Sequence, residues 1–166
     1  RMQCSNNLKQ LGLAMHNYAS TYSEMLPNGG WSRTGGYPND YSPLAKLLPF
    51  SEQQNLYNLV DFNIYMGHPG LNDLPTALHA AAATAVPFFF CPSDGENQVH
   101  SLTMPSGAVI PVAGSNYAMN QGSGMDKMFH PSLGTADGLC WNDAKIKFAS
   151  ITDGTSNTLA FTESLR

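Results

Sequence analysis

The sequence predicts an α+β fold, because helical patterns precede short strand patterns along its 166 residues. A set of mostly apolar residues recurs every three or four positions near the start, which is typical of one face of an amphipathic helix: Cys4, Leu8, Leu11, Met15, Tyr18 and Tyr22. Strand candidates follow in the second half, at residues 88–91, 109–112, 116–119 and 158–162. No repeat and no alternation of strands with helices occurs, so we expect the strands to pair antiparallel.

The first helix is expected over residues 1–22, because the segment 26–30 contains Pro27 and two consecutive glycines that cannot continue it. No capping residue precedes Cys4, so the pattern predicts that this helix continues one that begins further upstream. Its apolar stripe has two compatible interpretations: a helix that faces the core of the domain, and the lower half of an assembly helix.

Shorter helices are expected in the middle of the chain. Residues 43–49 predict a short helix or turn. Residues 51–59 begin with Ser-Glu-Gln-Gln, a capping-box pattern that predicts a second helix. Asn72 or Asp73 is expected to cap a third helix, with Pro75 in its first turn. The whole chain, residues 1–166, is thus expected to be one head domain: the helix at 1–22 and a globular region at 23–166.

The composition favours a protein outside the cytoplasm that does not bind nucleic acid. Charged residues make up only 12% of the chain, against about 25% in ordinary globular proteins. Neutral polar and turn-forming residues replace them, although a cytosolic protein with an unusual surface is the alternative. The formal net charge is -4, and no basic stripe is present to neutralise phosphates. No apolar run approaches the roughly 20 residues that span a bilayer.

The cysteines and histidines give no sign of an active site. The three cysteines, Cys4, Cys91 and Cys140, form no Cys-x-x-Cys pair. One disulfide in an oxidising compartment and three buried reduced thiols are both compatible with this number. The histidines are scattered, and neither a Gly-x-Ser-x-Gly elbow nor a phosphate-binding loop occurs. We therefore expect a protein that is not an enzyme and that has no catalytic residues.

Two oxygen-rich turns are the candidates for metal binding. Asp94 lies in one of them, and Asp153 and Asn157 lie in the other. Such turns can hold calcium, which takes six to eight oxygen ligands, but neither has the EF-hand spacing. The alternative is that these side chains bond their own backbone in Asx and ST turns. We expect no cofactor other than calcium at these residues.

Aromatic residues in two loop regions, 27–43 and 121–143, are the candidates for a ligand or partner surface. Exposed aromatic rings of this kind can stack on sugars or on partner proteins. The alternative is that they pack beneath the long loops. The residues concerned are Trp31, Tyr37, Tyr41, Phe129 and Trp141.

Several segments together resemble the motifs of a large bacterial family, the domain of unknown function 1559. They occur in the family's order and span nearly the whole chain, at residues 1–18, 47–57, 90–94 (Phe-Cys-Pro-Ser-Asp), 115–117 and 151–158 (Ile-Thr-Asp-Gly-Thr-Ser-Asn-Thr). Members often carry a prepilin-type cleavage and methylation signal. The resemblance implies a pilin-like fold, in which the N-terminal helix packs on a small antiparallel sheet with long loops.

The resemblance also implies features that the residues alone do not. It implies a basic leader and a roughly 20-residue apolar helix upstream of residue 1, and members usually have a further His-x9-Asp-Gly segment after the position where this chain ends. It implies a disulfide between Cys4 and Cys91, with Cys91 and Cys140 as the second choice. In the chain-entropy model such a long bridge is worth ~4 kcal/mol.

The function that follows is a non-catalytic, pseudopilin-like structural subunit of a cell-surface or secretion filament. Its partners would be other pilin-like subunits, or copies of itself, through the N-terminal helix, and the membrane through the upstream helix. The full-length protein would be periplasmic or at the cell surface, attached to the inner membrane. The alternative is an extracellular module that binds a glycan or a protein with its aromatic loops, and a concave aromatic pocket would favour it.

Overall fold

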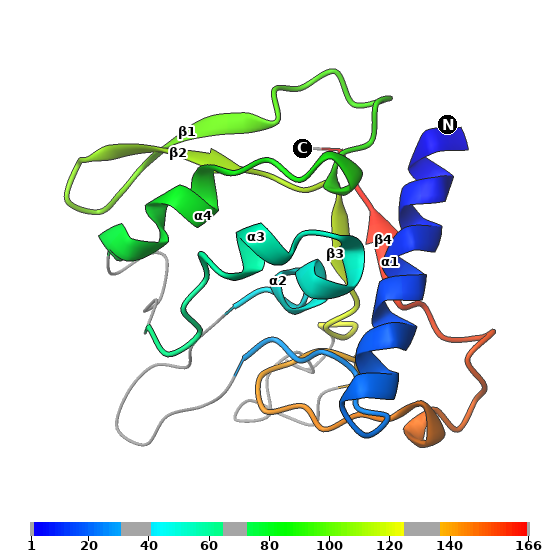
Figure 1. The fold of residues 1–166 in the computed structure, drawn as a ribbon. Helices are drawn as coiled ribbons and strands as arrows, with labels where there is room; N and C mark the ends of the chain where they lie inside the picture. Colours follow the sequence, from blue (N-terminus) through cyan, green and yellow to red (C-terminus); the bar gives the residue numbers. More distant parts are fainter. Residues whose placement is uncertain (1, 31–40, 65–72, 125–136, 166) are drawn as a thin grey trace.

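A computed structural model of the chain describes residues 2–30, 41–64, 73–124 and 137–165, and its α+β architecture confirms the predicted fold class. The helix α1 (Met2–Thr21) comes first and forms one edge of the fold (Figure 1). The elements that follow, with 3₁₀ helices written η, are α2 (Pro43–Leu47), η1 (Leu48–Ser51), α3 (Gln54–Tyr57), η2 (Thr76–Leu78), α4 (His79–Ala83), η3 (Pro87–Phe89), β1 (Val99–Thr103), β2 (Val109–Ala113), β3 (Tyr117–Met119), η5 (Phe148–Ser150) and β4 (Phe161–Glu163).

The helix α1 lies on the rest of the molecule along the predicted stripe. It contacts α2, η1, η3 and β4, and it buries the small residues Ala14 and Ala19 as well as the larger apolar side chains. At the end of the stripe, Tyr22 is exposed. The helix ends because Ser23 and Glu24 both adopt the left-handed conformation, with φ of 55° and 66°. The chain therefore turns before it reaches Pro27.

The strands pair antiparallel, as predicted, but they form two separate two-stranded sheets. The hairpin of β1 and β2 pairs Thr103 with Val109 and turns through Gly107, whose φ of 88° favours glycine. The second sheet pairs β3 with β4, and Met119 lies opposite Phe161. It brings the last described strand beside α1 (Figure 1).

Three local predictions are wrong. Residues 88–91 are not a strand, because Pro87 begins a 3₁₀ turn in which the Phe90 N–H donates to the Pro87 carbonyl at 3.3 Å. Ser51 caps no helix, because its hydroxyl donates back to the Leu47 carbonyl at 2.9 Å and Glu52 is left-handed. Asp73 does not cap its helix either, since Pro75 precedes the first helical turn, and the alternative cap, Asn72, lies outside the described residues. The Asp73 carboxylate accepts from Ser106 N–H in the β1–β2 turn at 3.0 Å.

One hydrophobic core joins α1, α2, η1, η3 and the β3–β4 sheet. Leu11 and Leu47 at its centre have no exposed surface, and Cys4 and Cys91 belong to the same cluster. In the ranges that the structure describes, no helix combines the length and the apolar character needed to cross a membrane.

Candidate functional site

The disulfide of the structure joins Cys4 on α1 to Cys91, which follows η3. Both residues are buried, and their Cα atoms lie 4.8 Å apart although 87 positions separate them in the sequence. This is the pairing that the family resemblance implied. The second choice, Cys91 with Cys140, is wrong, because Cys140 is a free, buried thiol.

A buried asparagine stands next to the disulfide on the same face of α1. Asn7 is 1% exposed, and its side-chain amide donates to the Phe90 carbonyl at 2.8 Å and to the Tyr117 hydroxyl at 3.4 Å. The Tyr117 hydroxyl in turn donates to the Cys4 carbonyl at 3.3 Å. Sequence reasoning missed Asn7, although its position three residues after Cys4 and four before Leu11 places it on the core-facing stripe.

A second buried asparagine connects the disulfide to the end of the chain. Asn116 is 1% exposed and its side-chain oxygen accepts from Cys91 N–H at 2.9 Å. Its amide group donates to the Asp94 carboxylate at 2.5 Å and to the Ser164 carbonyl at 2.9 Å. We call Cys4, Asn7, Cys91, Asn116 and Tyr117 the asparagine hub, because two asparagines satisfy the buried polar groups around the disulfide.

The predicted calcium ligands lie in two turns, where oxygens of Asp94 and Asp153 accept hydrogen bonds from the protein itself. Asp94 accepts from Asn116 and from Glu96 N–H. In the other turn, Asn157 donates to the Asp153 carbonyl at 2.7 Å, and Thr158 donates to the Asp153 carboxylate at 2.9 Å. These contacts have the local pattern of the Asx and ST turns. Calcium binding at these residues stays a prediction.

Among the described residues, one group of three metal-ligating types lies close together: Cys4, Cys91 and Glu163, with ligand atoms within 4.8 Å of one another. The two sulfurs are bonded to each other, so neither can become the thiolate that binds a metal. The group therefore has the donor set of a metal site only after reduction.

The predicted aromatic surface is corrected at Tyr41, which is not exposed. It is 5% exposed, and its hydroxyl donates to the carbonyls of Asp61 at 2.6 Å and Ile64 at 2.8 Å. Burial, with the Asp61 charge as a smaller cause, raises the pKa of Tyr41 to about 12. Trp141 is half-buried. The other three residues of the prediction, Trp31, Tyr37 and Phe129, lie outside the described residues.

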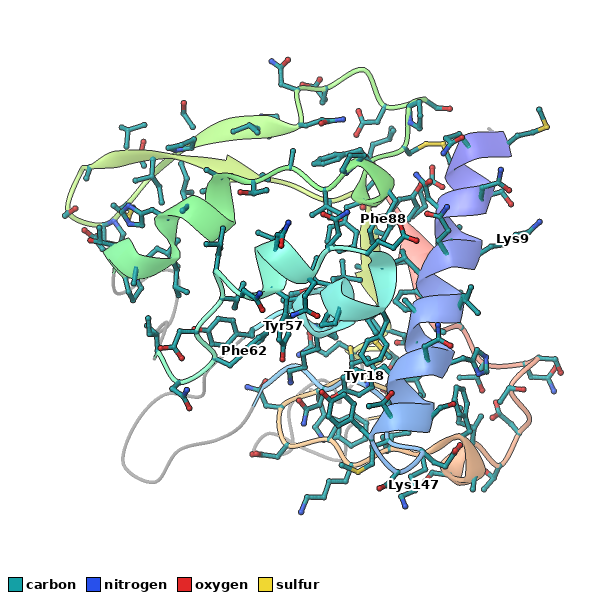
Figure 2. The ribbon with its side chains drawn as sticks, viewed as in Figure 1. Lys9, Tyr18, Tyr57, Phe62, Phe88 and Lys147 are labelled. Atoms are coloured by element: carbon teal, nitrogen blue, oxygen red, sulfur yellow. A yellow bond between two sulfur atoms is a disulfide. The ribbon has the colours of Figure 1, made fainter. Side chains whose placement is uncertain are left out.

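Tyr41 instead lines a concave pocket of about 340 Å³, which we call the aromatic pocket. Figure 2 shows Tyr18 on α1 with Tyr57 and Phe62 nearby, between α1 and the segment that follows α3. The Phe62 ring lies 4.9 Å from that of Tyr41 and 5.2 Å from that of Tyr57. The pocket lining consists of Tyr18, Tyr22, Gly30, Tyr41, Lys46, Tyr57, Phe62 and Asn63.

Three tyrosine hydroxyls of the aromatic pocket influence one another. Burial raises the pKa of Tyr18 to about 12, and repulsion from the Tyr22 and Tyr57 phenolates adds to the increase. The pKa of Tyr57 is raised by burial first and by Tyr22 second. The hydroxyls of Tyr18 and Tyr57 therefore stay protonated at neutral pH, where they can both donate and accept hydrogen bonds.

Lys46 contributes the positive charge of the aromatic pocket. Its amine donates to the Asn28 carbonyl at 2.9 Å and to the Asn28 side-chain oxygen. Burial lowers the pKa of Lys46 to about 8, so the amine is still mostly protonated at pH 7. No spacing rule finds this pocket, since its residues come from four separate segments.

A second, apolar pocket of about 330 Å³ lies between the short helices and β2. Its apolar lining includes Leu44, Leu48, Leu78, Val86 and Val112. The hydroxyls of Ser42, Thr84 and Ser115, which also line it, are bonded to backbone groups, so the pocket offers few polar groups to orient a ligand.

We expect the Cys140 thiol to resist alkylation in the native protein. It donates to the Asn120 carbonyl at 3.2 Å, and burial raises its pKa to about 12, with the Lys46 charge partly opposing the increase. At pH 8 almost no thiolate forms, and the thiolate is the reactive species. Mass spectrometry after iodoacetamide treatment without reductant should find no label on the native chain and one label after unfolding. Three labels would contradict the disulfide, and a labelled native chain would contradict the buried thiol.

Comparison with known proteins assigns the chain to a family. The sequence profile described as "Protein of unknown function (DUF1559)" matches residues 1–166, so the chain belongs to this family. Curated proteins gave no match, and solved structures gave none either. The family assignment confirms the resemblance found in the motifs, and it leaves the function open.

Proposed function

We propose that this chain is the head of a pseudopilin-like structural subunit and performs no catalysis. The observation that carries the proposal is the attachment of α1. A buried disulfide and Asn7 fix one face of this 20-residue helix to the head, while the opposite face is exposed. A helix held in this way can contact neighbouring subunits with its exposed face, while its buried face stays packed against its own head.

The exposed face of α1 would contact the partners, which are other pilin-like subunits or copies of this chain. It carries Leu13, which is 63% exposed, among polar neighbours that include Asn6, Lys9 and Asn17. The full-length protein would be attached to the inner membrane by an upstream helix and would place this head in the periplasm or at the cell surface. Nucleic acid is not a partner in this proposal.

Two of the described histidines, His16 and His79, make contacts that suit a role without catalysis. His16 stacks on the Phe148 ring at 4.6 Å, and His79 shares a hydrogen bond with the Leu74 carbonyl at 2.9 Å. Neither contact places a base next to a nucleophile. We propose no cofactor, and calcium at Asp94, Asp153 and Asn157 is a separate question for a binding measurement.

Cysteine cross-linking in cells tests the assembly role. In the full-length protein we expect Leu13→Cys to give a cross-linked dimer with a bifunctional maleimide, because Leu13 lies on the proposed contact face and each added thiol can join two subunits. Val109→Cys is the matched control, since Val109 is 60% exposed but lies on β2, in the hairpin. Equal amounts of cross-linked dimer from both variants, or no dimer from Leu13→Cys, would contradict assembly through α1.

The second candidate function is an extracellular module that binds a glycan or a protein. One observation favours it, the aromatic pocket. The residues differ from the predicted loop surface except for Tyr41, so the pocket supports ligand binding by a different set of aromatic side chains. The two functions are compatible, because Leu13 does not line the aromatic pocket.

A further inference from the structure

The aromatic pocket has the size and the lining of a small-molecule site. Its volume of about 340 Å³ lies within the range of roughly 300–1,000 Å³ that such sites occupy. Its aromatic rings come from two parts of the chain. Tyr18 and Tyr22 come from α1 and its end, and Tyr41, Tyr57 and Phe62 come from the middle of the chain. Rings on two sides can hold a flat ligand between them.

Polar groups that can form hydrogen bonds accompany these rings in the lining of the pocket. The hydroxyls of Tyr18, Tyr22 and Tyr57 interact electrostatically, and Asn63 and Lys46 also line the pocket. A purely apolar ligand would remove water from these groups and give nothing in return, which is unfavourable. The ligand should therefore carry apolar faces and several hydroxyl groups on one frame.

The charge of Lys46 excludes the other ligand class that aromatic pockets commonly take. Rings of tyrosine and phenylalanine often surround a quaternary ammonium group, because the cation is attracted to their faces. Here Lys46 lines the same pocket and its amine is mostly protonated at pH 7, so its charge repels a second cation. A neutral or acidic ligand does not meet this repulsion.

We propose that the aromatic pocket binds a saccharide, with the C–H face of a pyranose ring against Tyr57 and Phe62 and its hydroxyls against the tyrosine hydroxyls and Lys46. This inference rests on the second function proposed above, the binding module, and it is independent of assembly through α1. A saccharide carries apolar C–H faces and hydroxyl groups on one frame, and these match the aromatic rings and polar side chains of the pocket.

Titration of the 166-residue chain with three probes tests the inference. The probes are cellotriose, chitotriose and tetramethylammonium chloride, followed at pH 7 by calorimetry and by chemical shifts. We expect at least one of the two oligosaccharides to bind and tetramethylammonium not to bind. Phe62→Leu should weaken the saccharide at least tenfold. The control is Phe88→Leu, the same change at another half-buried phenylalanine that lines neither described pocket and lies well away from Phe62 in Figure 2, and it should leave affinity unchanged.

A third variant separates recognition from folding. Tyr57→Phe keeps the ring and removes only the hydroxyl, so it should fold like the wild type and still bind more weakly. Binding of tetramethylammonium without either saccharide would overturn the saccharide inference and leave the binding module standing. No binding of any probe by the folded chain, or equal saccharide affinity in all variants, would overturn the inference, and the absence of any ligand would count against the binding module as well. The cross-linking result for α1 is unaffected by each of these outcomes.

Discussion

Replacing both disulfide cysteines, as Cys4→Ala with Cys91→Ala, is expected to lower the free energy of unfolding by about 4 kcal/mol. The bridge spans 87 positions, so its loss frees a long segment of the unfolded chain that the disulfide now restricts. Loss of the bridge also removes the covalent link between α1 and the turn after η3. The hydrogen bonds of Asn7 and Tyr117 depend on that link, because they join α1 to this part of the head. Urea unfolding followed by circular dichroism measures the change.

The matched control for the disulfide is Cys140→Ala. Cys140 is also a buried cysteine, but it forms no covalent bond, so its replacement removes a weak hydrogen bond and a small volume. We expect a cost of about 1 kcal/mol there. Reduction of the wild-type protein should reproduce the double variant. A reduced chain as stable as the oxidised chain would show that the bridge restricts nothing the fold depends on.

The helix α1 could be predicted from the sequence because burial of one apolar face is enough to determine its structure. Its apolar residues repeat at the helical period along a single long face, and burial of that face outweighs every other local preference. The second strand of the β1–β2 hairpin was found for a similar reason, since it is rich in β-branched residues. The first strand was missed, because all of its residues are exposed and no alternation of apolar and polar residues marks it.

The wrong local predictions arose where a short sequence pattern was compatible with two different structures. The run at residues 88–91 is apolar enough for a buried strand, but Pro87 fixes the backbone for a 3₁₀ turn, and Phe89 and Phe90 become buried without forming a strand. Ser51 precedes a helix and has the composition of a cap, yet its hydroxyl reaches back one turn to Leu47. Such choices depend on neighbours that are distant in the sequence.

The aromatic pocket was beyond sequence reasoning for the same reason. Tyr18 belongs to the stripe of α1, where its spacing predicts a core contact, and Tyr57 belongs to a short helix. Their shared pocket exists because α1 and α3 both pack against η1, which places Tyr18 near the end of α1 close to Tyr57 at the end of α3. The hub was closer to prediction, since the disulfide and Asn116-Tyr117 were both identified by motif, but the hydrogen bonds between them were not.

Removal of the Asn116 side chain is expected to be the most costly single substitution of a polar residue in the hub. Asn116→Ala takes the acceptor away from the buried Cys91 N–H and the donor away from the Ser164 carbonyl, and it also ends the contact with Asp94. Loss of partners for buried polar groups costs about 1–3 kcal/mol each before relaxation, so we expect a decrease of about 3 kcal/mol in the free energy of unfolding. Asn157→Ala is the control, because Asn157 is exposed and its side-chain amide donates to the Asp153 carbonyl at 2.7 Å within its own turn, and it should cost less than about 1 kcal/mol.

The variant Asn116→Asp adds a test of charge at the same position. Its new carboxylate can still accept from Cys91 N–H, but it faces the Asp94 carboxylate where the amide donated before. Two adjacent carboxylates raise the pKa of one of them in the folded state, so the folded chain binds a proton more tightly than the unfolded chain. Stability of this variant should therefore rise as the pH falls through that raised pKa, and should be lowest at neutral pH. Urea unfolding at pH 5 and pH 7 measures the difference between variant and wild type. If that difference is the same at both values, the Asn116–Asp94 contact does not determine the stability of the hub.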